Sequence, residues 1–285
     1  MFSKIWEICS LSLAFCLFLS CQSRSNSREI VESADSLLYA EEDTFDIPEK
    51  EEDALEEVGS LEHLDVNFDD FMFSFIRSRQ LQRERVSRDL FVYDEEGKEV
   101  ALSRTDLRDA FSFLNGEYYT VLYGNVNQIE EEKNNQSDVI DVERIDLDLF
   151  HVTTYTFLQE KGKWMLADLN DNSFAEDELS DFLTFYAHFS VDSVFQAESI
   201  AQPLTIRMMD PDDELGVIDG TIDALQWSIF CPDVPEGVIS NIRYGQSYDN
   251  PRHIVLQKCG ISNGMQELFT FDKTGGRWRL TAYEN

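Results

Sequence analysis

Aromatic residues recur at helical spacing in two stretches of the chain, and the second stretch lies 114 residues after the first. Residues spaced i, i+3, i+4 and i+7 lie on one side of an α-helix, so each stretch predicts a helix with an apolar face. Ser78 and Ser193 follow these stretches and predict a break there, because serine often caps the start of a new helix. The face residues are Phe68, Phe71, Met72 and Phe75 in the first helix, and Phe182, Phe185, Tyr186 and Phe189 in the second.

Each predicted helix is followed by segments in which apolar and polar residues alternate. These segments are rich in Val, Thr and aromatic residues, which is typical of half-buried β-strands. Gly162 and the pair Gly275–Gly276 stand in the last connections and supply the backbone conformations of tight hairpins. Helices followed by antiparallel hairpins predict an α+β fold. The segments cover 149–160 and 163–169 in the first half, and 253–259, 265–273 and 276–283 in the second.

The 114-residue offset relates the two halves from start to end. "LQRERVSRDL" at 81–90 matches "FQAESIAQPL" at 195–204 in its Gln, its Glu, a β-branched residue and its final Leu. The chain is therefore predicted to hold two tandem homologous domains, 62–172 and 173–285, each with N-terminal helices packed on a curved antiparallel sheet. The matched tryptophans are expected to fill equivalent core positions. Matches near the ends are Gly162 with Gly276 and Trp164 with Trp278.

The second copy combines a helix, the motif "FQAESI", a Pro-Leu pair and a meander that ends in Gly-Arg-Trp. In these features it resembles the domain of unknown function 4348 family, a group of Bacteroidetes lipoproteins. The resemblance covers most of 65–285 and implies nuclear transport factor 2-like domains, which are cone-shaped α+β domains, and it implies no established activity. The first copy has Asp89 where the family pattern has Pro, and the second has Ser199 where it has Arg. The matching residues are Phe185, Phe189, Asp192, Phe195, Gln196, Ile200, Pro203 and Leu204.

Residues 1–20 have the composition of an export signal rather than of a folded segment. A mostly apolar run extends from Ile8 to Leu19, which is shorter than a membrane-spanning helix requires. The run ends in "FLSC", which resembles the lipobox of bacterial lipoproteins and implies that Cys21 becomes the lipidated N-terminus and membrane anchor. The alternative is an ordinary signal peptide in which Cys21 has no such role.

The formal net charge is −33, and acidic residues are in excess along the whole mature chain. This charge argues against partners that are bound through phosphates, so nucleic acid is excluded. Residues 21–60 become strongly acidic and contain few large apolar residues, which predicts a disordered stalk between the lipid and the first domain. Surface-exposed lipoproteins of the group that the chain resembles carry acids directly after the anchor Cys, whereas the first acid after Cys21 here is Glu29. The resemblance therefore implies an outer-membrane lipoprotein facing the periplasm, with the cell surface as the alternative.

Five arginines lie close together in the first copy, and the second copy has uncharged residues at the equivalent positions. The fold therefore does not need these charges. Three roles fit them: binding of an anionic ligand, contact between the two domains, or a solvated helix face that nearby acids balance. The residues are Arg77, Arg79, Arg83, Arg85 and Arg88.

Two pairs of polar residues occupy matching positions in the copies. Gln82 and Gln196 either bond a ligand or satisfy backbone groups where the helix meets the first strand, and the second role better explains why both copies keep an amide. Asp109 and Asp223 are the carboxylates to consider first for proton transfer, although a polar position on a helix explains them better.

Other reactive residues give weaker signals. Cys231 and Cys259 form a disulfide in an exported protein or remain two thiols. The acidic stretch 210–220 lacks the glycine position and the final acid of a calcium loop, and the four histidines show no paired metal spacing. No phosphate loop or nucleophile elbow is present in the sequence, so no catalytic residue, metal or cofactor is assigned.

Three functions follow as hypotheses. The first is a non-catalytic, lipid-anchored envelope protein that binds a small ligand or an envelope protein through a cone cavity or an interdomain groove. The second is an enzyme of the isomerase or dehydratase kind with a buried acid in one cone. The third is a structural module of the envelope. A cone filled by aromatic side chains argues against the enzyme, whereas a buried acid at the base of an open cavity favours it.

Overall fold

The computed structural model describes residues 64–285, except 88–89, 94–98, 102–106, 133–136, 211–212, 214–215, Cys231 and Ser262. The described residues all belong to one compact unit, residues 55–285. The predicted signal peptide, the lipidated Cys21 and the acidic stalk lie outside the described residues, so all three stay predictions. Among the helices that are described, none is long and apolar enough to cross a membrane.

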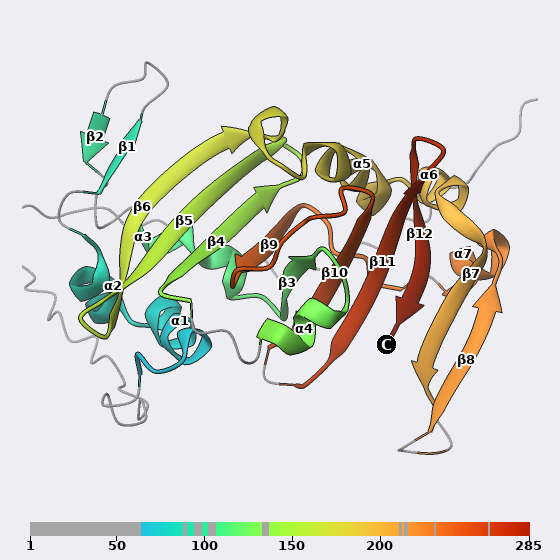
Figure 1. Ribbon diagram of the computed structural model, residues 1–285, viewed down its shortest axis with the longest axis horizontal. Coiled ribbons are helices and arrows are strands. Elements are labelled where there is room, and N and C mark those ends of the chain that lie inside the picture. Colours follow the sequence, from blue (N-terminus) through green and yellow to red (C-terminus); the bar gives the residue numbers. More distant parts are fainter. Residues whose placement is uncertain are drawn as a thin grey trace, which may run out of the picture. The chain divides into compact units, whose positions relative to one another are not determined.

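Short helices and antiparallel strands follow one another along both halves of the chain (Figure 1). The first half contains α1 (Phe68–Arg77), α2 (Arg79–Arg85), β1 (Phe91–Tyr93), β2 (Glu99–Ala101), α3 (Leu107–Ala110), η1 (Ser112–Leu114), β3 (Tyr118–Tyr123), α4 (Asn127–Glu132), β4 (Val139–Asp146), β5 (His151–Glu160) and β6 (Lys163–Ser173). The second half contains η2 (Phe174–Glu176), α5 (Ser180–Val191), α6 (Ser193–Glu198), β7 (Ile200–Met209), β8 (Val217–Ile222), α7 (Ala224–Phe230), β9 (Val238–Arg243), β10 (His253–Gly260), β11 (Gln266–Thr274) and β12 (Arg277–Glu284).

Each aromatic helix is followed directly by a second, shorter helix, which confirms the predicted breaks. The Ser78 hydroxyl accepts a hydrogen bond from the backbone N–H of Leu81 over 3.2 Å and caps α2. In the second half, Asp192 rather than Ser193 is the cap, and its carboxylate accepts bonds of 2.9 and 3.0 Å from two N–H groups of α6. The predicted cap of α6 is therefore wrong by one residue, because the preceding carboxylate reaches the free N–H groups of the first turn.

The two main sheets exchange a strand between the halves of the chain. β3, from the first half, forms the edge of a six-stranded sheet in the order β3-β10-β11-β12-β7-β8. β9, from the second half, pairs with β4 in a four-stranded sheet in the order β6-β5-β4-β9. β1 and β2 form a separate two-stranded sheet. The α+β class is confirmed, and each main sheet contains strands from both halves, a feature that the repeat did not indicate.

The strand registers follow the same offset as the sequence. Val86 forms a parallel bridge with Leu166, and Ile200 pairs in parallel with Leu280, 114 residues further along in both partners. Equivalent residues therefore occupy equivalent places where each short second helix meets the last strand. The domain boundaries at 172 and 173 are not tested by this correspondence and stay a prediction.

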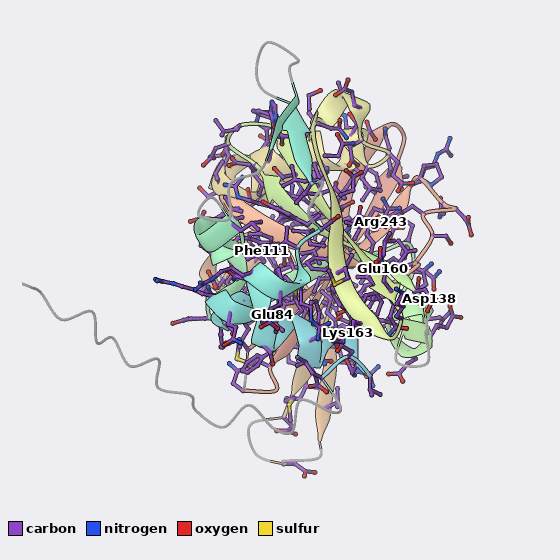
Figure 2. The ribbon with its side chains drawn as sticks, turned by 90° about the vertical axis from the view of Figure 1, so that its left-hand side faces the viewer. Glu84, Phe111, Asp138, Glu160, Lys163 and Arg243 are labelled. Atoms are coloured by element: carbon purple, nitrogen blue, oxygen red, sulfur yellow. The ribbon has the colours of Figure 1, made fainter. Side chains whose placement is uncertain are left out.

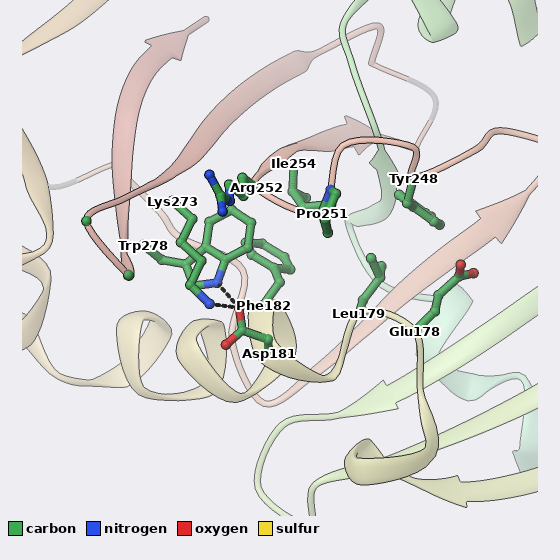
Figure 3. A pocket seen from close by; sticks show the side chains of 12 residues that line it. Glu178, Leu179, Asp181, Phe182, Tyr248, Pro251, Arg252, Ile254, Lys273 and Trp278 are labelled. Carbon is green, nitrogen blue, oxygen red and sulfur yellow. Dashed lines mark hydrogen bonds and ion pairs between the residues drawn. The ribbon is translucent and has the colours of Figure 1, made fainter.

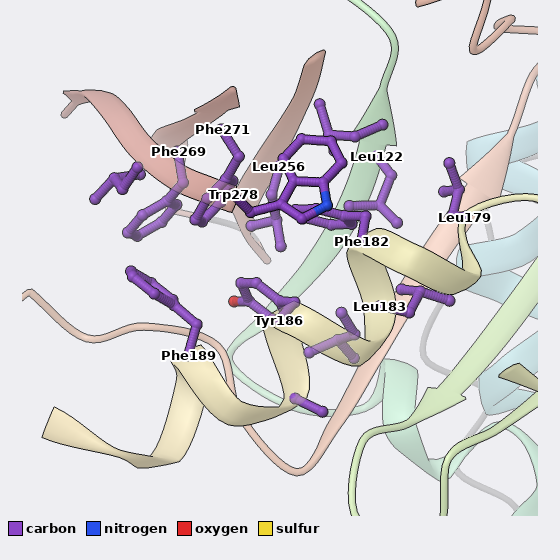
Figure 4. Packing of buried hydrophobic residues seen from close by; sticks show 14 of the residues in the cluster. Leu122, Leu179, Phe182, Leu183, Tyr186, Phe189, Leu256, Phe269, Phe271 and Trp278 are labelled. Carbon is purple, nitrogen blue, oxygen red and sulfur yellow. The ribbon is translucent and has the colours of Figure 1, made fainter. Parts of the chain in front are cut away.

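Aromatic side chains fill the space between the helices and each main sheet. The exchanged strands take part in this packing, since Leu122 of β3 joins the second-half core and Ile242 of β9 joins the first-half core. Trp164 and Trp278 are buried in the two cores, as predicted. Figure 4 shows the second-half cluster between α5 and the strands. The largest buried aromatics are Phe71, Phe75, Phe111, Tyr123 and Phe157 in one core, and Phe182, Tyr186, Phe189, Trp227, Phe269, Phe271 and Tyr283 in the other.

Candidate functional site

A cavity of about 620 Å³ lies at the margin of the second-half core, beside the start of α5. Figure 3 shows Asp181, Lys273 and Trp278 together on one side of the cavity, and Glu178, Leu179 and Tyr248 on the other. Its walls therefore combine aromatic and aliphatic surface with a small number of charged groups. The lining residues are Glu178, Leu179, Asp181, Phe182, Tyr248, Pro251, Arg252, Ile254, Lys273, Gly275, Gly276 and Trp278.

The tight turn between β11 and β12 forms one rim of the cavity. Gly275 and Gly276 adopt φ angles of +60° and +79°, which glycine accepts without the steric cost of a side chain. Lys273 and Trp278 lie on either side of this turn and both reach the cavity. The glycine pair that the sequence indicated as a hairpin turn therefore also shapes the entrance.

Asp181 connects both sides of that turn to α5. Its Oδ2 accepts a hydrogen bond of 2.5 Å from Lys273 Nζ and one of 2.8 Å from Trp278 Nε1 (Figure 3). The hydrogen bond from Lys273 is the main reason that the pKa of the Asp181 carboxyl lies below its ordinary value. Asp181 is thus ionised at neutral pH, and its charge is matched by the ammonium of Lys273.

The opposite wall is connected to a buried polar network between the two sheets. Glu178 Oε1 lies 2.5 Å from an Nη of Arg243, whose other Nη lies 3.4 Å from the buried Glu143. Glu143 also accepts a 2.7 Å bond from Asn241, which donates to the hydroxyl of Tyr248 over 3.2 Å. Burial raises the pKa of Glu143 to about 7, although Arg243 and Asn241 both favour its charged form. Arg243 therefore serves two carboxylates at once.

The backbone of Arg252 is hydrogen-bonded on both sides, whereas its side chain has no partner among the described residues. Its carbonyl oxygen accepts a 2.8 Å bond from the N–H of Lys273, and its own N–H donates to Asn250 over 3.2 Å. The side chain is exposed and, within the part of the chain that the structure describes, the guanidinium has neither an ion-pair nor a hydrogen-bond partner. It is therefore the unmatched charge among the groups that line the cavity.

The equivalent positions in the first half are hydrogen-bonded to one another. Gln159 donates to the carbonyl of Asp65 over 3.1 Å, and the N–H of Trp164 donates to the carboxylate of Asp65 over 3.0 Å. The indole N–H of Trp164 is buried and has no partner among the described residues, whereas that of Trp278 is bonded to Asp181. Leu179, Lys273 and Trp278 correspond to Asp65, Gln159 and Trp164.

The arginine cluster divides into one buried and three exposed members. Arg85 forms a bidentate pair of 2.7 and 2.9 Å with Asp65 and donates to the carbonyl of Trp164, so it bonds residues of the first half. Arg77 lies 3.5 Å over the ring of Phe73 and donates to its carbonyl. Arg79 and Arg83 are exposed on α2, the helix of Glu84 in Figure 2, and Arg88 lies outside the described residues. An anionic or interdomain role for the exposed members stays a prediction.

The matched polar pairs have structural partners where they are described. Gln82 Nε2 donates to the carbonyl of Phe75 over 3.0 Å, and Gln196 Nε2 donates to that of Ser190 over 3.5 Å, as expected for residues that satisfy backbone groups. Asp223 is exposed and caps α7 by accepting a 2.8 Å bond from the N–H of Gln226. The side chain of Asp109 lies outside the description.

The disulfide between Cys231 and Cys259 stays a prediction, because Cys231 lies outside the described residues. Cys259 is buried, and burial raises the pKa of its thiol to about 11, so it carries no thiolate at neutral pH. The described part of the chain contains no group of three or more His, Cys, Asp or Glu residues that could hold a metal ion.

The charged residues of the cavity were not singled out by sequence reasoning. The repeat held a signal for them, since Asp181, Lys273 and Arg252 correspond to Asn67, Gln159 and Asp138 in the first copy. Asp181 and Lys273 therefore replace uncharged residues of the first copy, and Arg252 replaces an acid.

The model of the family described as domain of unknown function 4348 matches residues 48–285. The chain belongs to this family. A crystal structure of an NTF2-like protein from Bacteroides fragilis is 34% identical, with a TM-score of 0.67 over 77% of this chain and 96% of that chain. No curated protein matches the chain. The NTF2-like fold that the resemblance implied is confirmed, and membership of the domain of unknown function 4348 family assigns no activity to the cavity.

Proposed function

We propose that the protein is a non-catalytic binding protein and that the cavity beside α5 holds a small organic ligand. The observation that carries this proposal is the cavity itself, at the edge of a core that aromatic side chains otherwise fill. Its volume of about 620 Å³ lies within the range of roughly 300–1,000 Å³ that is usual for small-molecule sites. Its walls combine apolar surface with charged side chains, and polar groups of this kind fix the orientation of a ligand in such sites.

The same geometry gives little support to the enzyme hypothesis. The two acids that line the cavity, Asp181 and Glu178, are both paired with cations, so neither is poised to take a proton. Glu143 has the raised pKa of a general acid, but it does not line the cavity, and Asn241 and Arg243 bond its two oxygens. A role in rigid structure explains Glu143 better than a role in proton transfer.

The neutral fluorescent probe N-phenyl-1-naphthylamine tests the cavity. Its emission is expected to rise on binding to the wild-type protein and to stay low with Leu179→Trp, which places an indole in the cavity. Leu149→Trp is the matched control, because Leu149 is exposed on the turn between β4 and β5 and does not line the cavity. Circular dichroism and thermal unfolding confirm that each variant is folded. Absence of probe binding to the wild type, or equal binding to both variants, contradicts the proposal and favours a structural module.

We also propose that the binding domain is tethered to the outer membrane through lipid on Cys21 and faces the periplasm. Support comes from the order of the chain, in which an apolar run and Ser20-Cys21 precede an acidic stretch. The acidic stretch repels anionic headgroups and keeps the domain away from the bilayer. The test is fractionation of cells that produce Cys21→Ala, which is expected to leave the protein out of the membrane fraction. A variant that stays with the membrane contradicts the anchor, and a wild-type protein that external protease cleaves in intact cells contradicts the periplasmic orientation.

A further inference from the structure

The charges around the cavity are matched except at one place. Asp181 is bonded to Lys273 at 2.5 Å, and Glu178 lies 2.5 Å from Arg243. The guanidinium of Arg252 has no such partner within the described residues, and its backbone is fixed against Lys273. Among the described cations that line the cavity, Arg252 is therefore the one without an acid bonded to it.

Part of the surface beside this charge is apolar. Leu179, Phe182, Ile254 and Trp278 belong to the second-half core and also line the cavity, and Tyr248 packs against the same core. The backbone of Arg252 is bonded to that of Lys273, and both residues line the cavity together with Pro251 and Ile254 (Figure 3). A ligand that covers this surface is expected to have an apolar body and to bring one end close to Arg252.

We propose that the cavity selects an amphipathic molecule with an apolar body and a single anionic group, which Arg252 binds. This inference rests on the proposed binding function and names the class of ligand. An arginine guanidinium presents two parallel N–H donors that fit the two oxygens of a carboxylate, sulfonate or phosphate. The adjacent ammonium of Lys273 adds positive potential, although Asp181 holds most of its charge.

The charge of the whole protein limits the number of anionic groups. With a net charge of −33, the chain repels polyanions at distances up to about 10 Å in ordinary salt. One negative group in direct contact with Arg252 gains a local pair, whereas further negative groups would meet the surrounding carboxylates. The ligand is therefore a monoanion, and neither nucleic acid nor a highly charged glycan fits the site.

Two probes with the same apolar body separate this inference from the binding function. N-phenyl-1-naphthylamine is neutral, and 1-anilinonaphthalene-8-sulfonate carries one sulfonate on the same rings. We expect the sulfonate probe to bind the wild-type protein about tenfold more tightly, because a charge-assisted bond to arginine contributes on the order of the free energy of a tenfold change in Kd. Arg252→Gln is expected to remove this advantage, so that the two probes bind the variant with similar Kd values.

Arg277→Gln is the matched control, since Arg277 is exposed at the start of β12, next to the turn that forms one rim of the cavity, but does not line the cavity. If only the overall positive potential near the turn matters, Arg277→Gln and Arg252→Gln will weaken the sulfonate probe equally, and the inference is wrong. If the neutral probe binds in the cavity and the sulfonate probe binds no better, the inference fails while the binding function stands. If neither probe binds, both fail. If the sulfonate probe binds Leu179→Trp as well as wild type, it binds elsewhere and the inference also fails.

Discussion

Thr120 of β3 and Ser240 of β9 form hydrogen bonds with each other's backbone, and the hydroxyl of each residue both donates and accepts. The N–H of each residue donates to the hydroxyl of the other, over 2.8 Å to Ser240 and 3.0 Å to Thr120. The hydroxyl of Thr120 donates to the carbonyl oxygen of Ser240 over 2.5 Å, and the hydroxyl of Ser240 donates to the carbonyl oxygen of Thr120 over 2.9 Å. Both residues are buried, and both lie on the strands that the two halves exchange. These four bonds join the two main sheets where water cannot replace them.

We expect Thr120→Val to lower the free energy of unfolding by about 1–3 kcal/mol. Valine keeps the volume of threonine but leaves buried donor and acceptor groups of Ser240 without partners, and such groups cost more than the lost bond is worth. Urea unfolding followed by circular dichroism measures the change. Thr205→Val is the control, because Thr205 is exposed on β7 and is expected to change stability by less than about 0.5 kcal/mol. Equal effects of the two substitutions would show that the bonds do not stabilise the fold.

The exchanged strands also predict how the halves fold. Residues 62–172 produced alone lack β9, and residues 173–285 produced alone lack β3, so each fragment has an unpaired edge on β4 or β10 and an incomplete core. We expect each fragment alone to be largely unfolded or aggregated, and the two together to form a soluble complex with one cooperative transition. Amide exchange and size-exclusion chromatography of the separate and mixed fragments measure this. A fragment that is monomeric and folded by itself contradicts the expectation.

Arg85 and Arg79 are expected to differ strongly in their contribution to stability. Arg85→Ala leaves the carboxylate of Asp65 partly buried without its cation, which is expected to cost about 2–4 kcal/mol. Arg79→Ala removes an exposed charge and is expected to change stability by less than about 0.5 kcal/mol. Thermal and urea unfolding of both variants check this, and similar losses for both would mean that the buried pair is not a main contact of the first half.

Glu143 makes stability depend on pH in a defined direction. Its pKa is raised from 4.5 to about 7 because it is buried, so the folded protein holds the proton more tightly than the unfolded chain. The corresponding stability is fully present below about pH 4.5 and is lost as pH rises through 7. We expect wild type to lose on the order of 1–3 kcal/mol relative to Glu143→Gln between pH 5 and 8. Urea unfolding at several pH values measures the difference, and parallel profiles of the two proteins would rule out this role.

The local pattern predicted the two aromatic helices, the short helices after them, the last hairpin of each half and the fold class, because periodicity and turn residues act over a few neighbouring residues. It did not predict the exchange of β3 and β9. Both strands have similar buried patterns, and the choice between pairing with the nearer or the farther half depends on the whole set of connections. The cap of α6 was misplaced for a smaller reason, since two adjacent residues, Asp192 and Ser193, can both accept the bonds of a first turn.

The candidate site was harder to predict than the fold. Its charges come from α5, the loop before β10 and the turn after β11, and only the folded chain brings these segments together. A sequence does not show which cations have an acid beside them. The exposed Arg252 and the buried Arg85 have the same formal charge and could not be told apart by it. The acids around each guanidinium distinguish the two arginines. Arg85 is paired with Asp65, whereas Arg252 has no acid partner among the described residues.

Asp181→Asn is expected to strengthen binding of 1-anilinonaphthalene-8-sulfonate by several-fold. The asparagine oxygen can still accept the bond from Trp278 Nε1, but Lys273 loses its counter-charge and becomes a second cation at the cavity. Fluorescence titration of the sulfonate and neutral probes measures the change, and only the sulfonate probe should respond. Asp219→Asn is the control, because this exposed acid lies 3.7 Å from Arg207 on the β7–β8 hairpin and does not line the cavity. If Asp181→Asn weakens the sulfonate probe, or strengthens both probes alike, charge at the cavity does not select the ligand.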